Sequence, residues 1–284
     1  MSQDTPQISP KVSRRPGRRA YFLIALFALA LVLFPFLFWY NTWFGRPLTD
    51  AELDTYFVDK EKPRHIQHAL VQLGERMSHA QTGARWYPNV LIQAHSPSLE
   101  IRQTAAWIMG QDRASQPFHD ALLSMLGDPQ PMVRRNAALA LSSFGDPAAR
   151  AELAAMLRPY TVTAPQAGKL HYRLKPGDYV NPGTLLAHIN VAHIGDTEVR
   201  SAVPGEVRAL DVKEGADVKA GDPIASLTAD QNHVWEALRA LYIVGGAAEL
   251  DDVDRFTRPV PGLPQTVVQQ ARLTIQGIQA RITR

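Results

Sequence analysis

The sequence predicts a multidomain α plus β protein, in which a single transmembrane helix precedes an α-solenoid and a small β barrel interrupts the solenoid. Three observations lead to this prediction. The run from Ala20 to Tyr40 has no charged residue over 21 positions, a helical pattern repeats at a spacing of 32 residues, and a strand pattern built on Gly and Val occurs twice between residues 160 and 228. A chain of 284 residues has room for two or three such modules.

The uncharged run is long enough to cross a hydrocarbon core of ~30 Å as a helix. Tyr21 at one end and Trp39, Tyr40 and Trp43 at the other are placed like the aromatic belts of the two membrane interfaces. A cleaved signal peptide is the alternative, but its apolar core would be shorter and small residues would follow it, whereas this run ends in "LFWYNTWF". We therefore expect an uncleaved transmembrane helix over residues 20–44.

Residues 1–19 form a basic tail of about +4 charge, with one acid, Asp4, against five cations, which are Lys11, Arg14, Arg15, Arg18 and Arg19. Positive charge beside a membrane helix favours the cytoplasmic side. The expected location is therefore the inner (cytoplasmic) membrane, with the tail in the cytoplasm and residues 45–284 in the periplasm. Because the net charge is +3, the rest of the chain is near −1, which argues against binding to nucleic acid. The absence of cysteine excludes disulfides, thiolate catalysis and Cys-ligated metal sites.

Helical repeats are expected over residues 49–158. Thr49 and Glu52 have the spacing of a capping box, and an amphipathic helix is expected from Pro63. The segments "SPSLEIRQTAAWIMG" from Ser96 and "DPQPMVRRNAALALSSFGD" from Asp128 then align without gaps, and a second helix follows each, starting with "QPFHD" and "DPAAR". The aligned pairs are Pro97 and Pro129, Ile101 and Val133, Arg102 and Arg134, Ala105–Ala106 and Ala137–Ala138, and Met109 and Leu141.

Two helices per unit of this length predict a solenoid, in which each pair buries its apolar face against the next pair. Ser or Asp before Pro should start the first helix of each pair. The two segments resemble HEAT repeats, and this resemblance implies that Arg102 and Arg134 brace neighbouring loops. Helical spacing resumes over residues 230–284, so we expect HEAT-like helices on both sides of the β module.

The β module is expected over residues 160–228. Its two halves share glycines and valines at equivalent positions, 37 or 38 residues apart, which are Gly168 and Gly205, Gly177 and Gly215, Val180 and Val218, and Gly183 and Gly221. The glycines suit tight turns and the valines point inward between them. Two such halves should intertwine into a flattened barrel with few exposed edges.

The doubled pattern resembles the biotinyl/lipoyl domain, a barrel-sandwich hybrid, over about 69 residues. Carrier members of that family hold a modified lysine at the hairpin between the halves, and counting back from Gly205 places Ile194 at that position. No lysine occurs from Val180 to Glu206. We therefore expect no covalent biotin or lipoate, and no cofactor.

The same fold occurs in periplasmic adaptors of export systems, the membrane fusion proteins, which the anchor and the β module also resemble. In those proteins a long helical hairpin separates the two halves. Here only Ile189 to Glu198 lies between them, and the adaptors have no solenoid. An adaptor of an export system is therefore the alternative hypothesis.

Nothing in the sequence predicts an active site, because the Ser-elbow, phosphate-loop, dinucleotide and zinc-protease motifs are absent. His188 and His193, with Asp196 and Glu198, match no defensible ligand spacing for a metal. The expected function is a non-enzymatic scaffold or accessory subunit that is held in the lipid bilayer and binds a protein partner on the periplasmic side. By analogy with other accessory subunits, the expected partner is a respiratory or redox membrane complex. The candidate protein-interaction residues are Arg102, Arg134, Arg135, His188, His193 and Ile194.

Overall fold

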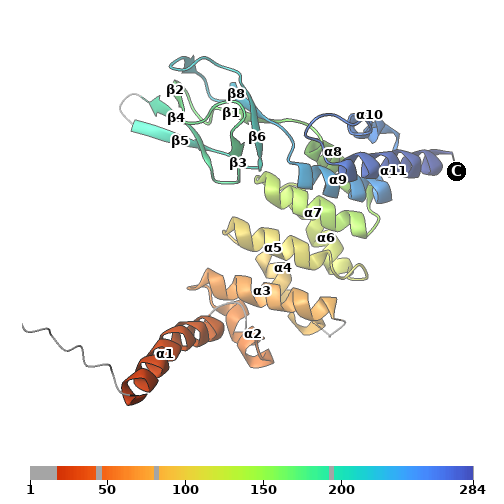
Figure 1. Cartoon of the computed structure of the whole chain (residues 1–284). Coiled ribbons are helices and arrows are strands. Elements are labelled where there is room, and N and C mark those ends of the chain that lie inside the picture. The colour runs from red at the N-terminus through yellow and green to blue at the C-terminus, as the bar shows by residue number, and fades with distance from the viewer. Residues whose placement is uncertain (1–17, 43–46, 80–82, 192–194, 284) are drawn as a thin grey trace, which may run out of the picture. The chain divides into compact units, whose positions relative to one another are not determined.

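The computed structural model describes residues 18–42, 47–79, 83–191 and 195–283 (Figure 1). The chain divides into two units, Met1–Thr49 and Asp50–Arg284. The predicted basic tail lies outside the described residues as far as position 17, and so do residues 43 and 44 of the predicted membrane segment.

In its described part, the first unit contains the helix α1 (Arg18–Thr42), with Pro35 inside it. The described side chains of its apolar stretch run from Tyr21 to Leu37, and all of them are exposed. Among the described residues, no helix is both long enough and apolar enough to cross a membrane. The prediction of a single transmembrane helix therefore has no support from this finding.

The second unit contains a stack of helices. They are α2 (Asp50–Val58), α3 (Pro63–Ser78), α4 (Tyr87–Gln93), α5 (Leu99–Met109), α6 (Gln116–Met125), α7 (Pro131–Ser143), α8 (Arg150–Met156), α9 (Gln231–Val244), α10 (Leu250–Asp254) and α11 (Gln265–Ile282), with short 3-10 helices η1 (Ala84–Trp86), η2 (Pro147–Ala149) and η3 (Ala247–Glu249) before α4, α8 and α10. The odd-numbered helices from α3 to α11 pack side by side, each against the next, and α4, α6, α8 and α10 pack against them from the other layer (Figure 1). This arrangement confirms the predicted solenoid of helix pairs.

The apolar helix residues that the 32-residue repeat aligns are the ones that hold α5 and α7 together. Each is at most 3% exposed, and these are Ile101, Ala105, Ala106 and Met109 in α5 and Val133, Ala137, Ala138 and Leu141 in α7. The paired alanines leave room for the neighbouring backbone, while the larger side chains fill the space between layers. The repeat in the sequence is therefore a repeat of the buried face.

The predicted helix starts were two residues too early. Ser98, not Ser96, caps α5, because its side chain accepts the Ile101 N–H, and Gln130, not Asp128, occupies the N-cap position of α7. The Asp128 carboxylate instead accepts the Gln130 N–H at 2.8 Å. An aspartate that binds the backbone two residues on forms a turn, and this turn precedes the helix.

The solenoid continues across the β module. α9 packs on both α7 and α8, although 74 residues separate Met156 from Gln231. The helix pair after the module repeats the pair before it at a spacing of 100 residues, since η3 and Gly245 correspond to η2 and Gly145. Arg158 joins the two sides through a bond from its Nη2 to Asp252 Oδ2 at 2.5 Å, and the Asp252 side chain is only 3% exposed. The β module is thus an insertion between two repeats of one solenoid.

The β module contains eight strands in two four-stranded sheets. The strands are β1 (Tyr160–Thr163), β2 (Gly168–Tyr172), β3 (Tyr179–Val180), β4 (Leu185–Val191), β5 (Gly195–Arg200), β6 (Gly205–Leu210), β7 (Asp217–Val218) and β8 (Pro223–Leu227). One sheet has the order β1-β8-β6-β3 and the other β5-β4-β2-β7. Each sheet therefore takes strands from both halves, and adding four to a strand of the first half gives its counterpart in the second.

The same Gly–Val pairing joins the two halves twice. Gly168 of the first half lies opposite Val218 of the second, and Gly205 of the second lies opposite Val180 of the first. Both valines are in the core between the sheets, at 1% and 4% exposure for Val180 and Val218. The prediction that the two halves intertwine is confirmed, and together they form two four-stranded sheets around one core.

Candidate protein-docking groove

A groove of about 870 Å³ lies on the face of the solenoid formed by α5, α7, α9 and α11. These four helices are successive members of the odd-numbered layer (Figure 1). The groove is therefore lined by helices from both sides of the β module in the sequence, since α5 and α7 precede the module and α9 and α11 follow it. We call this hollow the α5–α11 groove.

The floor of the α5–α11 groove is made of small residues, which are Gly110, Ala140, Ser142, Ser143 and Ala240. A Cβ atom added at Gly110 would lie 2.9 Å from the Ala140 Cβ, so α5 and α7 approach closely here. The Ser143 hydroxyl donates to the Gly110 carbonyl at 3.2 Å and ties the two helices together. The small side chains at the base leave the groove hollow, and the contacts between α5 and α7 keep these two helices close together.

The walls of the groove are large apolar side chains. Trp107 on α5, Tyr242 and Ile243 on α9, and Leu273 on α11 are 50%, 48%, 51% and 50% exposed. The Tyr242 ring lies against Gly277 of α11, where an added Cβ would be 2.8 Å from the ring. An apolar patch framed by polar residues is typical of a surface that binds another protein.

The charged residues of the groove are two arginines and one glutamate. Neither Arg113, just after α5, nor Arg239, on α9, has an ion-pair partner among the described residues. The Arg239 guanidinium lies 4.6 Å from the centre of the Trp235 ring, which holds it in a cation–π contact. Partial removal from water raises the pKa of Glu236, the nearby Asp230 raises it further, and Arg239 opposes both. The α5–α11 groove therefore carries an excess of positive charge.

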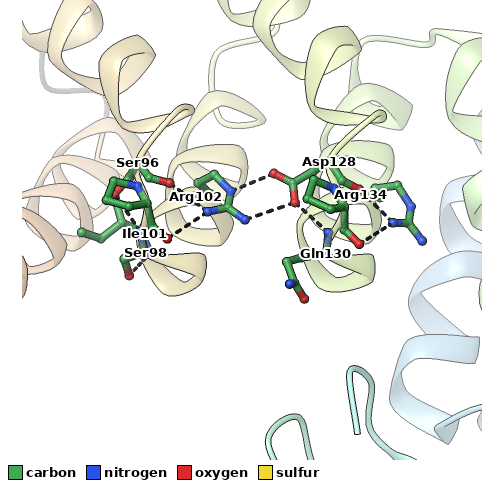
Figure 2. Close-up of polar contacts among 9 residues, drawn as sticks. Ser96, Ser98, Ile101, Arg102, Asp128, Gln130 and Arg134 are labelled. Carbon is green, nitrogen blue, oxygen red and sulfur yellow. Dashed lines mark hydrogen bonds and ion pairs between the residues drawn. The ribbon is translucent and has the colours of Figure 1, made fainter. Parts of the chain in front are cut away.

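The predicted interaction residues Arg102 and Arg134 contact the loops between repeats (Figure 2). Neither residue lines the groove. Arg102 donates from Nε to Asp128 Oδ2 at 2.7 Å, from Nη2 to Asp128 Oδ1 at 3.2 Å and from Nη1 to the Ser96 carbonyl at 2.8 Å. Arg134 repeats the pattern one unit later, donating from Nη1 to the Asp128 carbonyl at 2.8 Å and from Nε to Glu152 Oε2 at 3.0 Å. Arg102 therefore joins two successive loops between helix pairs, whereas Arg134 joins the loop before α7 to the helix α8.

Arg135 is buried, with 6% exposure, and leaves little surface for a partner. Burial lowers the pKa of Arg135, and the negative charges of Glu152 and Asp230 oppose that shift. Within the described residues its Nε has no hydrogen-bond partner, and neither has Nδ1 of His233 on α9. Burial, followed by the positive charge of Arg135, also lowers the pKa of His233. These two groups lie where α7 and α9 meet.

The β4–β5 hairpin places His188 in the middle of a row across three strands. His188 lies opposite His171 on β2 and opposite Glu198 on β5. The His171 Nδ1 is 2.8 Å from Glu214 Oε1, whereas the His188 Nδ1 is buried and has no hydrogen-bond partner in the described part of the chain. No set of three or more His, Asp or Glu within the described ranges is arranged to hold a metal ion. The predicted candidates His193 and Ile194, the latter at the expected carrier position, lie outside the described residues.

The groove residues were not among the candidates that the sequence indicated. One signal was available: Trp107 sits between the buried Ala106 and Ile108, so a large aromatic side chain lies off the apolar stripe of an otherwise well-patterned helix. Leu273 is similarly off the stripe of α11 that contains the buried Ala271 and Ile278. Trp107 and Leu273 line the same groove only because the helices before and after the β module stack on one another. No local sequence pattern predicts that stacking.

Two families match parts of the chain. The family described as HEAT repeats matches residues 88–163, and the family described as "Biotin-requiring enzyme" matches residues 160–227. Compared with curated proteins, the chain has no match. The HEAT match ends before α9, so the helices after the β module are assigned to the solenoid by their packing alone. The chain thus contains a HEAT repeat region followed directly by a biotinyl/lipoyl-like domain.

Proposed function

We propose that the chain is a non-enzymatic scaffold or accessory subunit that binds a protein partner through the α5–α11 groove. The groove itself carries the proposal, because it exposes four large apolar side chains above a floor of small residues. Trp, Tyr and Arg are the residue types most concentrated at the energetic centres of protein interfaces, and the groove presents all three. Its area also spans four helices, which suits an extended contact better than a small substrate.

We further propose that α1 anchors the chain in the inner membrane, with the following modules on the periplasmic side. The uncharged run from Ala20 to Tyr40 and the exposed apolar side chains between Tyr21 and Leu37 support an anchor, and the basic tail supports the orientation. One anchor followed by an outer binding module is a common plan for accessory subunits of membrane complexes. A respiratory or redox complex as the partner is an analogy with that plan.

The β module has the carrier fold without a carrier lysine. β4 ends at Val191 and β5 begins at Gly195, and no lysine lies between Val180 and Glu206. Without an amine at the hairpin there is no group that could form an amide with biotin or lipoate. In intact-mass spectrometry of the protein expressed with an active biotin and lipoate ligase, we expect only the unmodified mass. A species heavier by one biotinyl or lipoyl group would show that the module is a carrier.

The adaptor hypothesis requires a helical hairpin between the two halves of the β module. The three residues between Val191 and Gly195 leave no length for one. The scaffold proposal is favoured for this reason, and because the groove belongs to the solenoid, which adaptors lack.

The scaffold proposal is tested by copurification from native membranes. After cell lysis we expect the full-length protein in the membrane fraction, and after mild detergent extraction we expect it to elute with at least one other protein in a constant ratio. A variant with Leu273→Asp, which places a charge on the groove wall, should lose that protein while remaining in the membrane fraction. Recovery of the wild-type protein alone under several mild detergents would contradict the scaffold proposal, and recovery in the soluble fraction would contradict the anchor.

A further inference from the structure

We propose that the partner segment bound in the α5–α11 groove is an acidic amphipathic helix. This inference deepens the proposed scaffold function and rests on it. The apolar face of this helix contacts Trp107, Ile243 and Leu273. Asp or Glu residues flank that face and pair with the groove arginines.

The charge of the occupant follows from the unpaired cations of the groove. Arg113 and Arg239 have no ion-pair partner among the described residues. Other arginines of the helical stack are paired with carboxylates, namely Arg76, Arg85, Arg102, Arg134, Arg158 and Arg255. The acid of the lining, Glu236, is not within ion-pair distance of either. Complementary charge sets orientation and raises the association rate, so an acidic segment fits this surface and a basic one is repelled. The basic tail of this same chain is excluded as the occupant for that reason.

The helical form of the occupant follows from the backbone chemistry of the groove. Its walls are faces of α-helices, whose N–H and C=O groups are already bonded within each helix, so the groove offers no strand edge to an extended peptide. An extended segment would bury its own backbone groups against apolar walls without partners, which costs free energy for every such group. A helix satisfies its backbone internally and presents apolar side chains at positions i, i+3, i+4 and i+7.

The size of the groove sets the length of the helix. From α5 to α11 there are three steps between neighbouring helices, and at an interaxial distance of 8–10 Å they span roughly 24–30 Å. An α-helix rises 1.5 Å per residue, so a segment of roughly 16–20 residues would cross the groove. The small residues of the floor, such as Gly110 and Ala140, leave the depth that the anchoring side chains of such a helix need.

The test uses the full-length protein in detergent and three fluorescein-labelled 18-residue peptides, measured by fluorescence anisotropy. The first peptide has Leu and Phe at i, i+3, i+4 and i+7 and Glu at the flanking positions. The second has Lys in place of every Glu, and the third is the acidic peptide with two central prolines. We expect the acidic helix to bind, the basic peptide to bind at least tenfold more weakly, and the proline-containing peptide to lose binding.

A charge-reversal pair identifies the site. Arg113→Glu with Arg239→Glu should weaken binding of the acidic peptide at least tenfold and should strengthen binding of the basic peptide. The matched control, Arg208→Glu with Arg258→Glu, makes the same change in net charge at two exposed arginines outside the groove and should change binding less than twofold. Equal effects of the two pairs, or equal binding of the three peptides, would overturn the proposal.

The same pair separates this inference from the scaffold proposal. If a native partner copurifies with the wild-type protein and equally well with the Arg113→Glu and Arg239→Glu variant, the acidic-helix inference is wrong and the scaffold proposal stands. If the variant alone loses the partner, both are supported. If no partner copurifies with either protein, the scaffold proposal fails, whatever the peptides do.

Discussion

Replacing Arg102 by alanine is expected to lower the free energy of unfolding of the solenoid by about 2 kcal/mol, since the Arg102–Asp128 ion pair is partly buried and its hydrogen bonds join charged groups. The Arg102 and Asp128 side chains are only 13% and 11% exposed, and two N–H···O bonds join them across the repeat boundary (Figure 2). Without the guanidinium, the Asp128 carboxylate would keep the Gln130 N–H as its remaining hydrogen-bond donor among the described residues. The Ser96 and Pro97 carbonyls would lose the donor that now holds their loop.

Tryptophan fluorescence measures this effect on the solenoid alone. The five tryptophans of the chain all lie outside residues 160–228, and Trp86, Trp107 and Trp235 lie in the helical unit, so the β module contributes no tryptophan signal. In urea, the Arg102→Ala variant should unfold at a clearly lower midpoint than the wild type. Arg134→Ala should shift the midpoint about half as far, because one bond at 3.0 Å joins it to Glu152. The control Arg64→Ala, at an exposed position of α3, should change the stability by less than about 0.5 kcal/mol. A midpoint for Arg102→Ala that matches the control would show that the pair does not brace the repeats.

The same pair gives the solenoid a pH dependence with a defined sign. Burial alone would raise the pKa of Asp128, but the bonds from Arg102 and Gln130 and the charges of Arg102 and Arg134 hold that pKa below its usual value. A carboxyl with a depressed pKa in the folded state stabilises the fold above its unfolded-state pKa, and this stabilisation is lost as the pH falls from about 4 towards the folded-state pKa. The difference in unfolding midpoint between wild type and Asp128→Asn should therefore be largest near neutral pH and shrink on acidification.

Most of the architecture was predictable because it repeats in the sequence. The 32-residue spacing predicted which residues of α5 and α7 would be buried, and the doubled Gly and Val pattern predicted that two halves would pair across one another. Repeated packing demands the same side chain at the same place each time, so the alignment of two copies shows the buried face directly. The resemblance to HEAT repeats also implied that Arg102 and Arg134 brace neighbouring loops. The structure shows this for Arg102, whereas Arg134 braces one loop against α8.

The groove could not be predicted in this way, for a physical reason. Its walls are side chains that depart from the repeat, such as Trp107, and its two halves are brought together by α7 and α9, which the β module separates in the chain. Exposed apolar residues on single helices are ordinary. They indicate a binding surface only after stacking has placed them side by side over a floor of small residues.

The second large effect is expected at Gly205, where β6 passes close to the end of β8 within the second half of the β module. A Cβ atom at this position would lie 2.3 Å from the Thr228 carbonyl oxygen and 3.4 Å from the Leu227 Cβ. The obstacle is backbone, so it cannot be relieved by a change of side-chain rotamer, and β8 would have to move away from β6. That movement would break the bond from the Thr228 N–H to the Glu206 carbonyl, now 2.8 Å long. We expect Gly205→Ala to destabilise the β module by about 3 kcal/mol, the upper end of the cost of overpacking a core.

Gly215→Ala is the matched control, because the two substitutions add the same methyl group in different surroundings. Gly215 has a φ of +75° and open space around it, so alanine there meets only the cost of the left-handed backbone conformation, about 1 kcal/mol. Hydrogen exchange of peptides from residues 160–227 should show faster exchange throughout the module for Gly205→Ala than for Gly215→Ala, with the tryptophan-reported unfolding of the solenoid changed less in both. Equal exchange in the two variants would mean that β8 accommodates the added methyl group, so the close approach of β6 and β8 does not require glycine at position 205. The expected difference would instead show that the close packing of β6 against β8 is required for the stability of the β module, although the module has no lysine to present.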